Sequence, residues 1–156
     1  MPPEFLTKEG FTKLEKELDH LRTAKRMEVA KRLAEAAENS LGEFVEDPEF
    51  EAAKNEQSFV EGRIRELELL LANAQVIKKS RNKAGIVEIG TKVVIKEGRL
   101  KPEEYMIVGA AEANPREGKI SHQSPLGSAL MGKKEGDKVE VAAPSGSFSV
   151  KLVEVK

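Results

Sequence analysis

The chain has 156 residues, which suits one domain or two small ones. Its formal net charge of -1 excludes a global field that points to nucleic acid or to a membrane surface. The absence of cysteine excludes disulfides, thiol nucleophiles and thiolate metal sites. The N-terminal segment lacks the basic and apolar regions of a signal peptide, and no apolar run approaches the ~18 residues of a membrane span. We therefore expect a cytoplasmic protein.

A long helix is predicted from residue 7 to about residue 40, a segment without proline. Thr7 suits the N-cap, and Glu9 places a carboxylate in the first turn, at the positive end of the helix dipole. Apolar residues then recur three and four positions apart, at Phe11, Leu14, Leu18 and Leu21. Beyond them, steps of four from Lys25 to Val29 and Leu33 shift the stripe, as a stutter does in a coiled coil.

A second helix is predicted to begin at Pro48, with Asp47 as its N-cap. Its seam steps regularly by three and four through Phe50, Ala53, Gln57, Val60, Ile64, Leu67, Leu71 and Ala74. Both stripes are narrow, so each helix needs one partner rather than a surrounding core. Because the connection between them is short, we predict an antiparallel helical hairpin.

Basic residues cluster on the first helix, at Arg22, Lys25, Arg26, Lys31 and Arg32. One interpretation is a solvated helix face. The other is a patch that contacts phosphates, set back from the end of the hairpin. The sequence pattern leaves both interpretations open.

The pattern changes after Ile77. Residues 78–85 are polar and basic, which indicates a linker. Short β-type runs follow at residues 86–89, 91–96, 104–109, 119–121, 138–142 and 147–155. One short helix fits between them, capped by Ser124, with Pro125 in its first turn and Met131 near its end. We predict an α+β protein: a hairpin over 1–77, a linker over 78–85, and a domain of five or six antiparallel strands with one small helix over 86–156.

A complete active site is not evident in the sequence. His20 and His122 have no partners at metal-ligand spacing, and no nucleophile motif or phosphate-binding loop is present. Five of the nine residues from Glu43 to Glu51 carry a carboxylate. Carboxylate oxygens suit Mg²⁺, which usually takes only one or two of them from a protein. The segment therefore suits a supplement to a metal held by a partner; the alternative is a solvated acidic turn that favours a helix N-terminus.

Five segments carry a recognisable pattern in order: residues 6–11, 53–64, 70–77, 124–133 and 136–139. Together they resemble the Gre family of bacterial transcription elongation factors. The resemblance covers nearly the whole chain. It implies that the hairpin enters the secondary channel of bacterial RNA polymerase, and that an FKBP-like domain binds the rim of that channel. It also implies that the factor stimulates Mg²⁺-dependent cleavage of backtracked RNA by the polymerase and is not itself an enzyme.

The same resemblance implies the site residues. Glu43 and Glu46 would help to hold the second catalytic Mg²⁺ of the polymerase, with Asp47 as a third candidate, and the isolated protein is expected to bind no metal. The expected contacts to the 3′ end of the nascent RNA are Arg22, Lys25, Arg26 and Arg32. The expected polymerase contacts are Ser124, Pro125, Leu126 and Leu130. We expect a monomer with no membrane partner.

The tip of the hairpin departs from the family pattern acid-Leu-x-Glu-Asn-x-Glu-Tyr. Glu43 replaces an Asp, Asp47 replaces an Asn, Pro48 replaces a small residue, and about two extra residues lie near residues 40–42. Met27 stands where the family has a proline after the basic pair.

These departures leave alternatives. The favoured prediction is stimulation of cleavage, and the alternative is a Gre-like inhibitor that binds in the channel. A third hypothesis is a prolyl isomerase, but the second domain offers only Tyr105 and Phe148 for the aromatic pocket that such a site needs.

Overall fold

The computed structural model describes residues 2–39, 47–78 and 85–156. The chain divides into two compact units, Thr12–Asn73 and Met1–Phe11 together with Ala74–Lys156. The division differs from the expected boundary at residue 77. The reason is that β1 (Glu4–Thr7) pairs in parallel with β2 (Ala74–Ile77), and the two strands belong to the unit that holds the C-terminal sheet.

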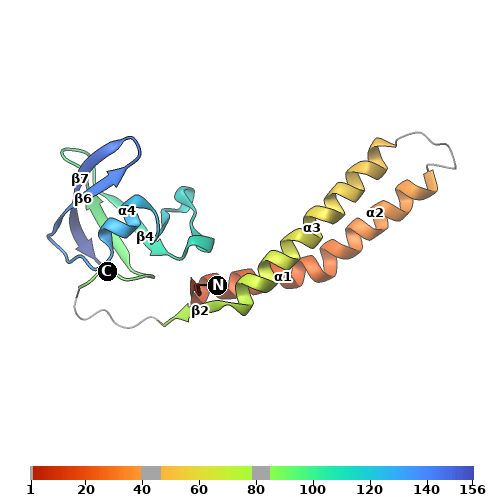
Figure 1. Ribbon diagram of the computed structural model, residues 1–156, viewed down its shortest axis with the longest axis horizontal. Coiled ribbons are helices and arrows are strands. Elements are labelled where there is room, and N and C mark those ends of the chain that lie inside the picture. Colours follow the sequence, from red (N-terminus) through yellow and green to blue (C-terminus); the bar gives the residue numbers. More distant parts are fainter. Residues whose placement is uncertain (1, 40–46, 79–84) are drawn as a thin grey trace. The chain divides into compact units, whose positions relative to one another are not determined.

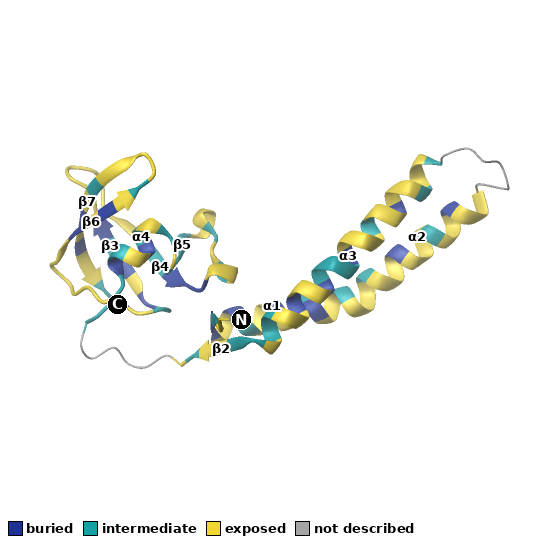
Figure 2. Ribbon diagram, viewed as in Figure 1, coloured by how far each residue is buried: buried dark blue, intermediate teal, exposed yellow. Residues whose placement is uncertain are grey.

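The first unit is the predicted helical hairpin (Figure 1). Its first arm consists of α1 (Lys8–His20), the π-helical turn η1 (Leu21–Lys25) and α2 (Arg26–Asn39), and its second arm is α3 (Pro48–Ala72). The side chains buried along the two arms are Leu14, Leu18, Val29, Ala36, Ala53, Val60, Ile64 and Leu67. Buried positions recur along both arms and alternate with exposed ones (Figure 2), as two narrow apolar stripes require.

The predicted stutter is a π-helical turn. The backbone N–H of Arg26 donates to the carbonyl of Leu21, five residues back, and also to that of Thr23. The hydroxyl of Thr23 donates to the carbonyl of Asp19 at 2.8 Å, which helps to satisfy the backbone of the wider turn. A π-helical turn contains one residue more than an α-helical turn. The apolar stripe therefore continues at Val29 on the buried side of the arm.

The predicted helix caps are confirmed. The hydroxyl of Thr7 accepts from the N–H of Gly10 at 3.0 Å, and Asp47 Oδ1 accepts from the N–H of Glu49 at 3.0 Å. The predicted apolar seam, which runs to Ala74, extends two residues beyond the second helix. The helix ends at Ala72, and Ala74 begins β2 because it pairs with Glu4 of β1.

The C-terminal sheet has five strands: β3 (Lys92–Lys96), β4 (Glu103–Val108), β5 (Lys119–Ser121), β6 (Lys138–Ala143) and β7 (Gly146–Val155). Their order is β5-β4-β3-β7-β6. The predicted antiparallel pairing is confirmed for β3 with β4, β3 with β7 and β6 with β7, and only the edge strand β5 runs parallel to its neighbour β4. Two short 3-10 turns, η2 (Ala110–Glu112) and η3 (Pro115–Glu117), lie in the connection between β4 and β5.

The predicted strand over residues 86–89 forms only a single bridge, between Ile86 and Lys134. The small helix is present as α4 (Pro125–Leu130), and Ser124 Oγ accepts from the N–H of Gly127 at 3.0 Å. The core combines side chains from the sheet, from α4 and from Val87. In the described ranges, no helix has the length and apolar character needed to cross a membrane.

Candidate functional site

The predicted metal-binding carboxylates Glu43 and Glu46 lie outside the described residues. Asp47 is the first described residue that follows them, and one of its carboxylate oxygens caps α3. Pro48 occupies the first turn and Glu49 follows it with its side chain exposed. The acidic segment therefore runs directly into the positive end of a helix dipole, where carboxylates are stabilised. A role for Asp47 as a third metal ligand stays a prediction.

Across residues 2–39, 47–78 and 85–156, no three His, Asp or Glu side chains gather in a way that could hold a metal ion. His20 is exposed on α1. The ring of His122 lies edge-on to Phe5 with centroids 5.8 Å apart, and His122 Nδ1 lies 3.4 Å from the carbonyl oxygen of Val108. These contacts give His122 a packing role. The described residues therefore offer no alternative to the predicted tip, which stays a prediction.

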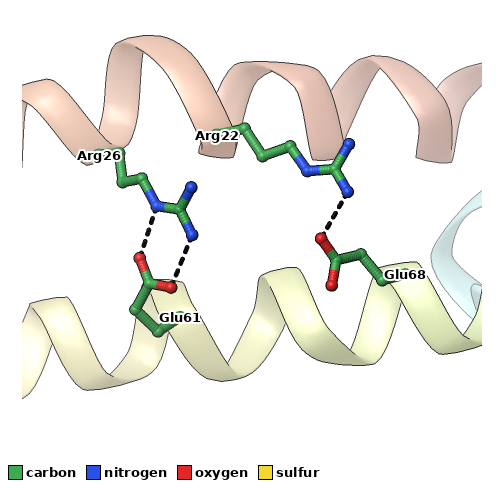
Figure 3. Close-up of polar contacts among 4 residues, drawn as sticks. All are labelled: Arg22, Arg26, Glu61 and Glu68. Carbon is green, nitrogen blue, oxygen red and sulfur yellow. Dashed lines mark hydrogen bonds and ion pairs between the residues drawn. The ribbon is translucent and has the colours of Figure 1, made fainter.

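The basic residues of the first arm form ion pairs with glutamates of α3. Figure 3 shows Arg26 and Arg22 pointing across the hairpin toward Glu61 and Glu68. Both contacts of Arg26, from Nε to Glu61 Oε1 and from Nη2 to Glu61 Oε2, measure 2.7 Å. This two-point contact matches the planar guanidinium to the carboxylate.

Glu56 of α3 receives two cations from the first arm. Lys25 Nζ lies 2.8 Å from Glu56 Oε1, and Arg32 donates to the other oxygen of the same carboxylate. Lys25 occupies the point at which the apolar stripe shifts, and Glu56 of α3 and Glu28 of its own arm both pair with its charge there. We define the interhelical ladder as the four cations Arg22, Lys25, Arg26 and Arg32 with the glutamates Glu56, Glu61 and Glu68.

The ladder shifts the pKa values of its members. The hydrogen bond from Arg26 lowers the pKa of Glu61, and the hydrogen bond from Lys25 lowers the pKa of Glu56. The pKa values of Lys25 and Arg26 are raised by the same bonds. All four groups lie at the surface, where water and salt screen the charges, so each pair adds only modestly to stability.

We expect acid to weaken the hairpin. The folded pKa values of Glu56 and Glu61 lie below the ordinary value of 4.5, so their contribution is present above that value and is lost as the pH falls through the folded values. Urea unfolding followed by far-ultraviolet circular dichroism at several pH values measures the loss. A Glu61→Gln variant has a lower stability at neutral pH and a flatter acid dependence. Identical pH slopes for wild type and variant would contradict the ladder's contribution.

The structure separates the predicted polymerase contacts into two groups. Pro125 is exposed and Leu126 is half-buried, so both are available to a partner. Ser124 has its hydroxyl engaged as the cap of α4. Leu130 is fully buried in the core, which contradicts a direct contact, because the inward side of so short a helix must pack against the sheet. The three positions 124–126 remain predictions.

Sequence reasoning missed the role of Glu112. Its two carboxylate oxygens accept from the N–H of Thr7 at 2.8 Å and from the hydroxyl of Thr7 at 2.6 Å. The same hydroxyl caps α1, so Glu112 supports the first turn of the helix from the C-terminal sheet unit. Because 105 residues separate Thr7 from Glu112, no local sequence pattern predicts this contact.

The aromatic residues of the sheet unit do not favour a prolyl isomerase. Tyr105 and Phe148 both pack against the core, and neither lines the groove on the outer face of the sheet. Tyr105 Oη donates to Glu103, which raises the pKa of the tyrosine. The two rings therefore serve packing and give no aromatic pocket on this sheet.

Comparison with known proteins identifies the family. Residues 4–76 match the family described as transcription elongation factor, N-terminal, and residues 82–156 match the family described as transcription elongation factor, GreA/GreB, C-term. The chain is 46% identical over 152 residues to the transcription elongation factor GreA of Clostridium acetobutylicum, covering 97% of this chain and 95% of that one. It is 47% identical over 152 residues to GreA of Acetivibrio thermocellus, covering 97% and 94%.

A solved structure of the GreA factor homolog 1 protein (Gfh1) of Thermus thermophilus is 30% identical, covers 99% of both chains and has a TM-score of 0.45. The sequence relatives carry the assignment, since both halves match in order and at near full length. The chain belongs to the GreA/GreB family of transcription elongation factors.

Proposed function

We propose that this elongation factor enters the secondary channel of RNA polymerase with its hairpin and stimulates the polymerase to cleave backtracked RNA. The observation that carries the proposal is a two-armed hairpin whose connecting segment, between Asn39 and Pro48, is rich in carboxylates. The 25 residues of α3 extend about 37 Å at the helical rise of ~1.5 Å per residue. Such an arm is long and narrow enough to follow a channel.

The chemistry of the donors fits Mg²⁺. Glu43 and Glu46 offer hard carboxylate oxygens at a spacing of three residues, and Mg²⁺ accepts one or two such ligands while keeping its waters. When bound, the ion polarises a phosphate and lowers the pKa of a coordinated water. In this proposal Glu43 and Glu46 complete and orient a site that the polymerase holds, while Asp47 anchors the start of α3. The polymerase remains the enzyme.

The ladder cations are proposed to contact the 3′ segment of the RNA. An arginine has five N–H donors, and the pairs with α3 use one or two of them. The side chains of Arg22, Arg26 and Arg32 are each about half exposed, at 47%, 47% and 51%. Their remaining donors can reach a phosphate while the ion pairs hold the side chains in place. This supports a dual role in hairpin stability and RNA contact.

The test is an assay on a halted, backtracked transcription complex that scores cleavage and elongation together. The factor with Mg²⁺ is expected to shorten the RNA and to restore elongation, and the factor alone is expected to leave free RNA intact. Slower nucleotide addition without added cleavage would instead support the inhibitor, which the elongation-factor names of the relatives do not favour. Cleavage of free RNA by the factor alone would contradict a shared metal site.

A further inference from the structure

Three lysines form a row across the outer face of the C-terminal sheet. Lys96 of β3 lies opposite Lys151 of β7, and Lys151 lies opposite Lys138 of β6. All three side chains are exposed, while their chain neighbours Ile95, Leu152 and Val139 are buried on the inner face. The three lysines line a shallow groove of about 670 Å³, together with Gly98, Pro102 and Ser149. We call this feature the lysine row.

The lysine row is unfavourable for the isolated protein. Like charges directly opposite each other on adjacent strands destabilise a sheet, and strands lie only ~4.8 Å apart. Within the described residues, none of the three ammonium groups forms an ion pair, whereas Lys156, the residue after β7, pairs with Glu104 of β4 at 3.2 Å. Glu140, two residues along β6 from Lys138, lies opposite Ser149 and gives no ion pair. Three unneutralised cations in register point to an anionic ligand.

We infer that the lysine row binds the phosphate backbone of a nucleic-acid duplex. Its length, two strand spacings or roughly 10 Å, faces about three phosphates of one strand at ~3.4 Å of duplex axis each. Lysine is depleted from protein–protein interfaces because its ammonium is strongly hydrated, whereas it serves readily as a point charge on phosphates. The groove contains no aromatic side chain on which an unpaired base can stack.

This binding surface is independent of the hairpin tip. The acidic segment acts through metal ligation and lies in the hairpin connection, whereas the lysine row acts through counterion release on the sheet unit. Binding is expected to be sequence-independent, because the lysines offer no planar fork for reading base edges. With three phosphate contacts, the logarithm of the association constant is expected to fall against the logarithm of the salt concentration with a slope of about -2.7. The affinity then drops about 40-fold between about 50 and 200 mM salt.

The test measures binding of the full chain to a short fluorescent DNA duplex by anisotropy across a salt series. The triple variant Lys96→Gln, Lys138→Gln, Lys151→Gln is expected to lose at least about tenfold in affinity at low salt and about 0.9 of slope per lysine. The matched control is Lys13→Gln, Lys16→Gln, Lys54→Gln, three exposed hairpin positions outside the basic cluster, which changes the net charge equally and is expected to bind as the wild type does.

Equal losses in both triple variants, or no duplex binding by the wild type, would overturn the inference. Tighter binding of a polyglutamate chain than of the duplex at the same salt concentration would also overturn it, because the partner would then be an acidic polypeptide. Thermal unfolding distinguishes a lost site from a lost fold. Because the substitutions remove like-charge repulsion, the row variant is expected to be at least as stable as the wild type.

Discussion

Replacing both Glu43 and Glu46 by glutamine is expected to lower stimulated transcript cleavage by about 100-fold or more. An amide keeps the size of the carboxylate. It lacks the negative charge with which a carboxylate competes against water for a place on Mg²⁺. A weakly placed ion loses the orientation of its attacking water, and small displacements of reacting groups cost orders of magnitude in rate. The measurement is the cleavage rate of a backtracked complex at fixed Mg²⁺, with each factor variant in excess.

Two variants of the same segment act as controls. Glu51→Gln makes the same chemical change on the exposed first turn of α3 and is expected to retain cleavage. Asp47→Asn keeps an oxygen that can cap α3, and asparagine is among the best N-cap residues, so it tests metal ligation apart from helix stability. Raising the Mg²⁺ concentration is expected to rescue the double variant in part. Full cleavage by the double variant would contradict the tip assignment.

Replacing Gly109 by alanine is expected to destabilise the C-terminal unit by about 3 kcal/mol. A Cβ at this position would lie 1.7 Å from the carbonyl oxygen of Phe5 and 2.8 Å from its carbonyl carbon. These are backbone atoms of β1, so relief requires the strand to move rather than a side chain to rotate. Gly109 is buried and has a φ of -67°, so close approach and not backbone strain demands a glycine there.

The matched control is Gly62→Ala. Gly62 lies inside α3, and a Cβ there would meet nothing within 4 Å. Alanine has the higher helix propensity, so this variant is expected to gain about 0.5–1 kcal/mol. Hydrogen exchange locates the effect of Gly109→Ala: β1 amides are expected to exchange faster while hairpin amides around Val60 keep their protection. An alanine variant at position 109 as stable as the wild type would show that β1 is not held tightly.

The interhelical ladder changes how the basic cluster is understood. The sequence left two interpretations of the cluster open, a solvated face and a phosphate-contacting patch. In the structure, four cations of the cluster are paired with glutamates of α3. These partners lie 24 to 46 residues away in the chain. The pairing could not be predicted from the first helix alone, because it depends on the register that the buried seam of the hairpin sets.

The sequence by itself determined the features that depend on neighbouring residues. Apolar periodicity predicted both arms and the shift that became the π-helical turn, and side-chain chemistry predicted the caps at Thr7, Asp47 and Ser124. Alternation and turn residues predicted the five strands of the C-terminal sheet. The acidic tip and the family resemblance also follow from the sequence. These succeed because helix capping and amphipathic spacing act within one or two turns of chain.

Only the tertiary structure decided the features that join distant segments. It pairs β1 with β2, turns β5 parallel to β4, buries Leu130 and brings Glu112 to Thr7 across 105 residues. It also aligns the three lysines of the sheet, which are scattered over 55 positions (151 minus 96) in the chain. Strand partners and registers depend on which surfaces fit together when the core is buried, and no local pattern contains that information.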